Sequence, residues 1–90
     1  MSEELKEKFE QAAKDVTQLS EAPDAQTKLR LYGFYKQATE GDCKGSRPGM
    51  MDFVGRAKYD TWKALEGTSK EQAMQLYVNL VEELKAQDKK

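Results

Sequence analysis

Apolar residues recur at intervals of three and four positions along most of this chain, and that spacing limits the possible folds more than any other feature. The clearest run near the start comprises Leu5, Phe9, Ala12, Ala13, Val16 and Leu19. A second run near the end comprises Ala73, Leu76, Tyr77, Leu80, Val81 and Leu84. Such spacing aligns side chains on one face of an α-helix, whereas a half-buried strand needs alternation, which the sequence lacks. We therefore predict an all-α fold.

Residues that stop and start helices divide the first half of the chain. Pro23 cannot continue the interior of the first helix, and Asp24 is a suitable N-cap for the next one. We expect that second helix over residues 25–40. Gly41 is placed to end it, because glycine readily adopts the backbone conformation that closes a helix.

The second half of the chain contains the longest stretch without periodicity. Residues 42–49, DCKGSRPG, are rich in glycine, proline and small polar residues and predict a loop. A third helix is expected over about 51–65 and is stopped by Gly67. Thr68 and Glu71 then form a predicted capping box that opens the fourth helix. Together these segments predict a four-helix bundle in a single domain spanning residues 1–90.

Length and composition exclude several classes of protein. A chain of 90 residues with 38% hydrophobic content is long enough for one core. With the single cysteine Cys43 and no histidine, it has no intrachain disulfide, no thiolate metal cluster and no imidazole base. We therefore expect neither a metal site nor enzyme activity. The hydrophilic start and the lack of a long apolar stretch favour a cytoplasmic protein without membrane insertion.

The charges are unevenly distributed, although the net charge is only -1. Residues 28–63 hold eight Lys or Arg and four Asp or Glu, which makes this middle segment +4. A basic segment inside an acidic chain favours a compact anionic ligand over a long polyanion, so we do not expect nucleic-acid binding. Ordinary scatter of surface charge would produce a similar count.

One face of the second predicted helix combines apolar, phenolic and cationic side chains. Leu29, Tyr32 and Lys36 share this face, and Tyr35 borders it. Phenols and ammonium groups suit a ligand that carries a flat ring and phosphates, with the ring stacked and the phosphates neutralised. The same residues are also compatible with the ordinary surface of a small bundle. A further alternative is a helical interaction module with a groove for a partner helix.

Several motifs together resemble the acyl-CoA-binding protein family. They are YGFYKQATEGD at 32–42, RPG at 47–49 followed by DF at 52–53, AKYD at 57–60 with Trp62, and GTSKE at 67–71. The resemblance covers nearly the whole chain, in order and at family length. It implies an up-down-down-up four-helix bundle that binds long-chain fatty acyl-CoA thioesters without a cofactor or metal. Such a protein would be a monomer that holds, buffers and carries these esters, in transient contact with enzymes and membranes.

The resemblance also implies a ligand set in this chain. Its members are Tyr32, Tyr35, Lys36, Lys58 and Tyr77 for the nucleotide, with Leu29 along the apolar groove for the acyl tail. Thr17 stands where some relatives have a lysine near the ligand, and Lys14, almost a turn away, is a candidate replacement. Lys28 occupies a place that is apolar in some relatives, so we expect one tail contact to differ there.

Overall fold

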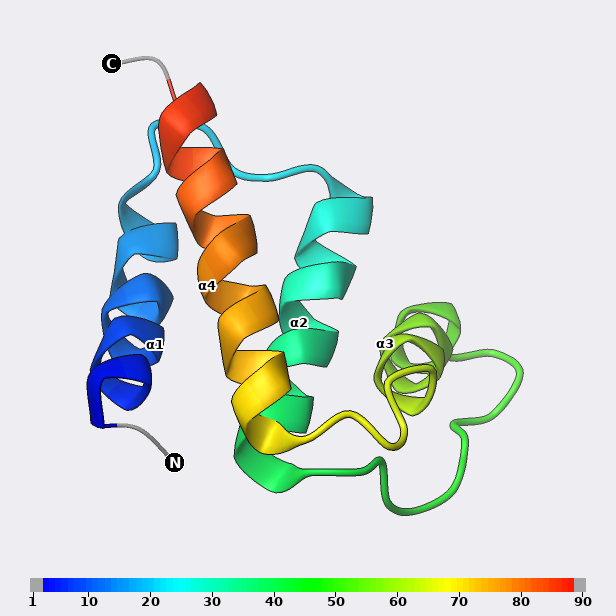
Figure 1. Cartoon of the computed structure of the whole chain (residues 1–90). Coiled ribbons are helices and arrows are strands. Elements are labelled where there is room, and N and C mark those ends of the chain that lie inside the picture. The colour runs from blue at the N-terminus through cyan, green and yellow to red at the C-terminus, as the bar shows by residue number, and fades with distance from the viewer. Residues whose placement is uncertain (1–2, 89–90) are drawn as a thin grey trace.

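The computed structural model describes residues 3–88 and is built from helices joined by loops (Figure 1). The elements are α1 (Glu3–Asp15), the short 3-10 helix η1 (Val16–Gln18), α2 (Ala25–Glu40), α3 (Phe53–Lys63) and α4 (Lys70–Gln87). No strand occurs within the described range, so the prediction of an all-α fold is confirmed. Nor is any helix within this range long and apolar enough to cross a membrane.

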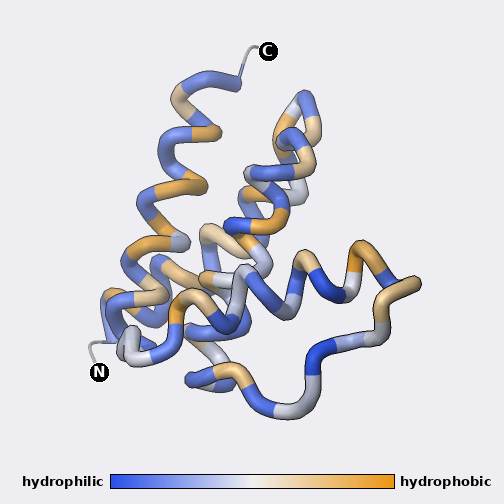
Figure 2. The backbone as a smooth tube through the Cα atoms, turned by 90° about the vertical axis from the view of Figure 1, so that its right-hand side faces the viewer, coloured by the Kyte–Doolittle hydropathy of each residue, from blue (hydrophilic) through white to orange (hydrophobic). Residues whose placement is uncertain are grey.

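The helix α4 lies at the centre of the arrangement. It packs against α1 on one side and α2 on the other, while α3 packs against the far side of α2. In the view of Figure 1, α1 rises, α2 descends and α4 rises again, and α3 is seen nearly end-on. Figure 2 shows α3 lengthwise, crossing in front of the other helices. Two faces of α2 are thus available for building a site, one toward α3 and one toward α1 and α4.

The core forms where α1, α2 and α4 meet. Its buried members are Phe9, Ala12, Leu31, Ala38, Ala73, Met74, Tyr77, Val78, Leu80 and Val81. Leu76, which the periodicity included in the apolar stripe, is instead 40% exposed. It lies about 100° round the helix from Tyr77, whereas Met74 and Val78 occupy the buried side because α4 is covered by two helices.

The first two helices largely follow the predicted boundaries. Asp24 caps α2 by accepting a hydrogen bond from the Thr27 amide at 2.7 Å, and Gly41 ends the helix at a φ of 83°. The first helix is shorter than the apolar run suggested, because the α-helix ends at Asp15 and continues only as the 3-10 turn η1. Leu19 consequently lies outside the helix, in an extended conformation.

The third helix is also shorter than expected and closes through tight turns. It begins at Phe53, after Asp52 has capped it by accepting from the Gly55 amide at 2.9 Å. After Lys63, the amides of Leu65, Glu66 and Thr68 donate to carbonyls three residues earlier. Such i to i+3 bonds are typical of frayed helix ends, where the α-helical pattern tightens.

The capping box of α4 lies one residue later than predicted. The Ser69 hydroxyl accepts from the Gln72 amide at 3.0 Å, and the Gln72 side chain accepts from the Ser69 amide at 3.1 Å. The prediction of Thr68 and Glu71 was therefore wrong. Both pairs have the required spacing, and the tertiary structure selects the second because Thr68 is already engaged in the preceding turn and in a contact with α2.

Close packing fixes α3 against α2. A Cβ atom added to Gly33 would lie only 2.8 Å from Cγ2 of Thr61, so glycine permits the approach of these two helices. The indole nitrogen of buried Trp62 donates to the Gly41 carbonyl at 2.8 Å. These contacts hold α3 at the position where its first turns face α2 across a groove.

The loops beside this junction are tied down by polar side chains. Fully buried Gln37 donates through Nε2 to the Thr68 carbonyl at 2.7 Å and to Asp42 at 2.9 Å. Asp42 also accepts from the Gly67 amide at 3.0 Å. These bonds, first from the Gly67 amide and then from Gln37, lower the pKa of Asp42 below its ordinary value of 3.8.

Candidate functional site

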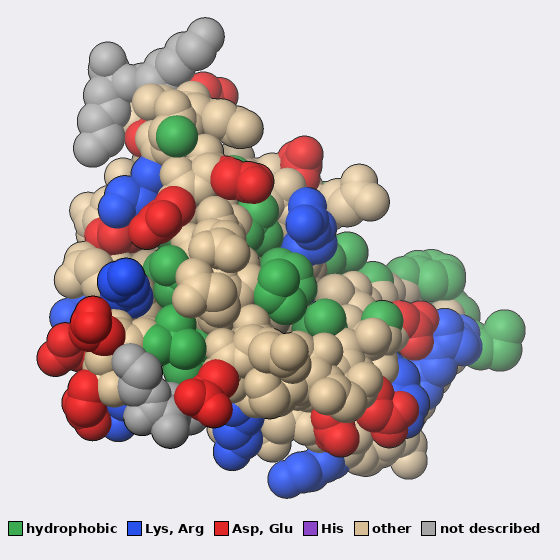
Figure 3. All heavy atoms as spheres, viewed as in Figure 1, with side chains coloured by type: hydrophobic (Ala, Val, Ile, Leu, Met, Phe, Trp, Pro, Cys, Tyr) green, Lys and Arg blue, Asp and Glu red, His purple; other side chains and the backbone are tan. Residues whose placement is uncertain are grey.

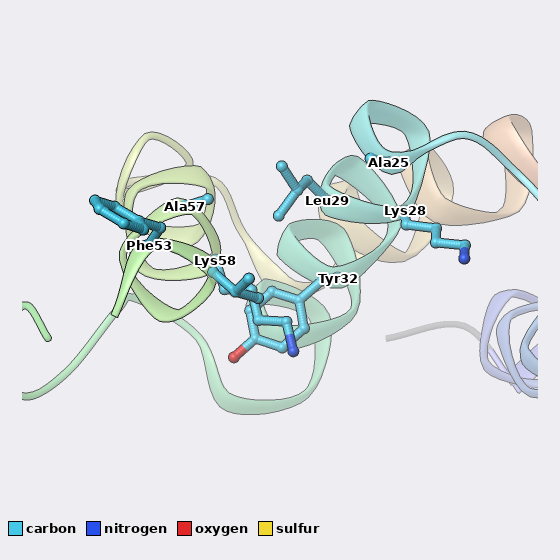
Figure 4. A pocket seen from close by; sticks show the side chains of 8 residues that line it. Ala25, Lys28, Leu29, Tyr32, Phe53, Ala57 and Lys58 are labelled. Carbon is cyan, nitrogen blue, oxygen red and sulfur yellow. The ribbon is translucent and has the colours of Figure 1, made fainter. Parts of the chain in front are cut away.

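An apolar groove runs between α2 and α3 (Figure 4). It has a volume of about 360 Å³ and a predominantly apolar surface. Its walls are formed by Ala25, Lys28, Leu29 and Tyr32 of α2 and by Phe53, Val54, Ala57 and Lys58 of α3. Figure 4 shows the Leu29 side chain extending from α2 toward α3. A groove of this shape and composition suits a hydrocarbon chain, whose burial needs no polar partner.

A second depression, which we call the hollow, has a volume of about 390 Å³ and lies beside the groove, between α2 and the helices α1 and α4. It is lined by Ala13 of α1, Val16 of η1, Lys28, Leu31, Tyr32 and Tyr35 of α2, and Tyr77 of α4. Lys28 and Tyr32 belong to both linings, so the groove and the hollow adjoin at these two residues. The site therefore has an apolar groove toward α3 and an aromatic hollow toward α1 and α4, with Lys28 lining both and Lys58 lining the groove.

Two tyrosines that line this hollow, Tyr35 and Tyr77, pack against the buried ring of Phe9. Phe9 stacks on Tyr35 with ring centroids 5.5 Å apart, and its other contact is edge-on to Tyr77 at 5.1 Å. Tyr77 is only 5% exposed, whereas Tyr35 is 43% exposed. Burial, with a smaller contribution from Tyr35, raises the pKa of Tyr77, so its phenol stays neutral and able to donate a hydrogen bond. The Tyr35 ring is therefore the one that a ligand can reach, and the Tyr77 ring is buried behind it.

Lysines approach these aromatic residues from two helices. The Lys58 ammonium of α3 lies 5.3 Å from the centroid of the Tyr32 ring, as Figure 4 shows across the groove. The Lys36 ammonium lies 5.0 Å from the Trp62 ring and forms an ion pair with Glu40.

The environment of Lys36 keeps its side chain cationic. Its hydrogen bond to Glu40 raises its pKa most, and the neighbouring phenols of Tyr32 and Tyr35 raise it further. The protonated ammonium therefore remains charged at neutral pH, close to the two tyrosines that border the hollow. An anionic group bound there would compete with Glu40 for this ammonium.

The structure brings together most of the residues singled out from the sequence. Those that line the groove or the hollow are Leu29, Tyr32, Tyr35, Lys58 and Tyr77, with Lys36 beside them. Lys14 and Thr17 line neither; both are exposed, Lys14 in the last turn of α1 and Thr17 in η1, and the Thr17 hydroxyl donates to the Lys14 carbonyl at 2.7 Å.

Lys28 is the residue whose place in the site the sequence did not predict. It lies four positions before Tyr32 and eight before Lys36, which puts all three on one helical face. That spacing is the sequence signal for its place in the site, whereas the family resemblance predicts only an altered tail contact at Lys28. In Figure 4 its side chain points away from α3, toward the other side of α2. Lys28 thus adds a third cation at the junction of the groove and the hollow.

The residues that the structure describes offer no metal centre. Within 3–88, no group of three or more Cys, Asp or Glu side chains is placed to hold an ion.

Comparison with known proteins places the chain in one family. Residues 6–81 match the model of the family described as acyl CoA binding protein. Acyl-CoA-binding domain-containing protein 1 of Oryza sativa subsp. japonica is 50% identical over 80 residues, covering 89% of this chain and 88% of the relative. Acyl-CoA-binding domain-containing protein 3 of the same rice is 51% identical over 80 residues, covering 89% of this chain and 52% of the relative. The chain thus spans about half the length of the latter protein.

A solved structure agrees with this assignment over almost the entire fold. The crystal structure of Oryza sativa acyl-CoA-binding protein 2 is similar with a TM-score of 0.88 and 43% sequence identity. The alignment covers 92% of this chain and 90% of that one. With a family match over most of its length and close relatives of nearly equal size, this chain belongs to the acyl-CoA-binding protein family.

Proposed function

We propose that this protein binds long-chain fatty acyl-CoA esters, buffers them and carries them through the cytoplasm as a monomer without chemical change. The observation that carries the proposal is the junction at Lys28 and Tyr32 between an apolar groove and an aromatic hollow, with Lys58 and Lys36 close to Tyr32. A fatty acyl-CoA has the same two parts, a hydrocarbon tail and a nucleotide with phosphates. The rice relatives are named for acyl-CoA binding, which supports this choice of ligand.

The groove between α2 and α3 would take the tail. Leu29 and Ala57 face each other across it, with Phe53 and Val54 toward the start of α3. Each methylene removed from water contributes up to about 0.8 kcal/mol, equivalent to up to about fourfold in affinity. Because the groove is open on one side and the tail loses freedom on binding, we expect a smaller gain per methylene.

The nucleotide would lie against the hollow and the lysines around it. The accessible ring of Tyr35 can stack on adenine, and the Tyr32 hydroxyl can donate to a phosphate oxygen. Lys58 lies over the Tyr32 ring, Lys36 lies near Tyr32 and Tyr35, and Lys28 lines the hollow, so these lysines can supply the positive charge. Charge-assisted hydrogen bonds of this kind can replace the strong hydration of phosphates.

Calorimetric titration with a graded series of acyl-CoA esters tests the tail assignment. We expect affinity to rise steadily from octanoyl-CoA to palmitoyl-CoA and to level off once the groove is filled. Free CoA is expected to bind most weakly, since it lacks the hydrocarbon part. Equal affinity for acetyl-CoA and palmitoyl-CoA would refute the assignment of the groove.

Two conservative variants with matched controls test the nucleotide assignment. Tyr32→Phe and Lys58→Met are each expected to weaken palmitoyl-CoA binding by about 1–3 kcal/mol, the cost of losing a hydrogen bond to a charged group. Tyr59→Phe and Lys63→Met change the same residue types on α3, at positions that line neither the groove nor the hollow. Equal effects in variants and controls would contradict the assignment. A smaller effect of both variants on 3′-dephospho esters would assign them to the 3′-phosphate.

The proposed role is non-catalytic, and it is tested separately. Cys43 is the only thiol, and the chain has no histidine to activate a nucleophile. Palmitoyl-CoA incubated with the protein is therefore expected to be recovered unchanged by chromatography. Native mass spectrometry is expected to show one acyl-CoA on a single chain. A stable protein partner in place of that adduct would favour the interaction module instead.

A further inference from the structure

An exposed apolar group lies at the start of α3. Met50, Met51, Phe53 and Val54 are 76%, 88%, 75% and 66% exposed, and we call these four residues the apolar tip. They account for four of the six exposed large hydrophobic residues in the described part of the chain. Side chains of this kind are normally covered, so a concentration of them marks a surface that meets an apolar partner.

The apolar tip is held as a preformed projection. In Figure 2 it lies where the loop that follows α2 turns into α3, at the edge of the molecule. Figure 3 shows hydrophobic side chains projecting at the corresponding edge, with both basic and acidic side chains beside them. The Asp52 amide donates to the Gly49 carbonyl at 3.0 Å, and the Asp52 side chain accepts from the Gly55 amide. Because this turn already satisfies backbone groups, it can enter a less polar environment at lower cost.

The charges around the apolar tip are mainly positive. Residues 44–60 contain Lys44, Arg47, Arg56 and Lys58 and two acids, Asp52 and Asp60, which gives the segment a net charge of +2. Asp52 is occupied in capping α3, and Asp60 forms an ion pair with Arg47, which leaves Lys44, Arg56 and Lys58 as the other cations of this segment. An apolar projection surrounded by Lys and Arg is complementary to the interface of an anionic bilayer, where apolar side chains reach the acyl region and cations meet headgroups.

The apolar tip is also continuous with the groove, since Phe53 and Val54 belong to both. We propose that it docks shallowly into the surface of bilayers containing anionic phospholipids and turns the groove toward the membrane. The direction of docking rests on the proposed function, because a hydrocarbon tail would then pass between bilayer and groove with little exposure to water. A second copy of the chain or a partner helix would not require the surrounding positive charge.

Sedimentation with vesicles free of acyl-CoA tests this docking. The wild-type protein is expected to bind phosphatidylcholine vesicles containing phosphatidylserine, and to bind them less at high salt. The double variant Met50→Ser/Met51→Ser is expected to bind about tenfold less or weaker still, because two exposed apolar side chains no longer insert. The matched control is Leu76→Ser, which changes an exposed apolar residue on α4. It should bind vesicles like the wild type.

Calorimetry with palmitoyl-CoA on the same proteins separates the two proposals. Met50 and Met51 line neither the groove nor the hollow, so their replacement should leave ester binding in solution unchanged. If vesicles bind but palmitoyl-CoA does not, the docking stands and the proposed function fails. Docking is overturned if the double variant sediments like the wild type, or if neutral vesicles bind equally well. It is also overturned if the wild type forms a dimer that the double variant abolishes.

Discussion

Replacing Gly33 with alanine would test whether the close approach of α2 and α3 builds the groove. The new Cβ would lie 2.8 Å from Cγ2 of Thr61 and 3.3 Å from a methyl carbon of Leu65, both closer than ordinary contact. Overpacking of this kind costs about 1–3 kcal/mol. The alanine recovers up to about 1 kcal/mol in helix propensity. We therefore expect a net loss of about 1 kcal/mol in the free energy of unfolding, together with weaker palmitoyl-CoA binding as α3 shifts.

A second substitution, at Thr61, tests whether the collision with its methyl group causes this loss of stability. Thr61→Ser removes the Cγ2 methyl that collides while keeping the hydroxyl that donates to the Ala57 carbonyl at 2.8 Å. Urea denaturation of the two single variants and the double variant forms a thermodynamic cycle. The double variant should recover most of the stability and ester affinity that Gly33→Ala loses. If Gly33→Ala alone were as stable as the wild type or more stable, the packing argument would be wrong.

Three further predictions concern the site and the loops that support it. Lys28→Met should weaken palmitoyl-CoA binding about threefold to tenfold in calorimetry, because a cation is lost where the groove and hollow meet; unchanged affinity would remove Lys28 from the site. Trp62→Phe should lower the free energy of unfolding in urea by about 1 kcal/mol or more through loss of the hydrogen bond to the Gly41 carbonyl, whereas a stable variant would show that this bond is dispensable. Hydrogen bonds from the Gly67 amide and the Gln37 side chain lower the pKa of Asp42, so its contribution to stability is present above its ordinary value of 3.8 and is lost as pH falls through the lower, folded value. Melting temperatures measured from neutral to acid pH should therefore fall less for Asp42→Asn than for the wild type, and parallel curves would contradict this linkage.

The helices could be predicted because their signals are local. Apolar spacing, the Asp24 cap and the Gly41 stop all act within a few residues, and α2 occupies the predicted range. The capping box was misplaced by one residue because Thr68 and Ser69 both have a suitable partner three positions later. Two tertiary contacts decide between them: the Thr68 amide donates to the Leu65 carbonyl in the turn after α3, and the Thr68 carbonyl accepts from Gln37 of α2.

In the candidate site, too, local sequence signals determined some features and tertiary contacts determined others. Helical spacing alone was enough to place Leu29, Tyr32 and Lys36 on one face of α2, since that relation depends only on the helical repeat. Tertiary packing decided that Lys58 lies over Tyr32 from another helix. It also buried Tyr77 while leaving the tip of α3 exposed. Local periodicity specifies which side chains share a face, but the partner that each face meets depends on contacts between segments far apart in the chain.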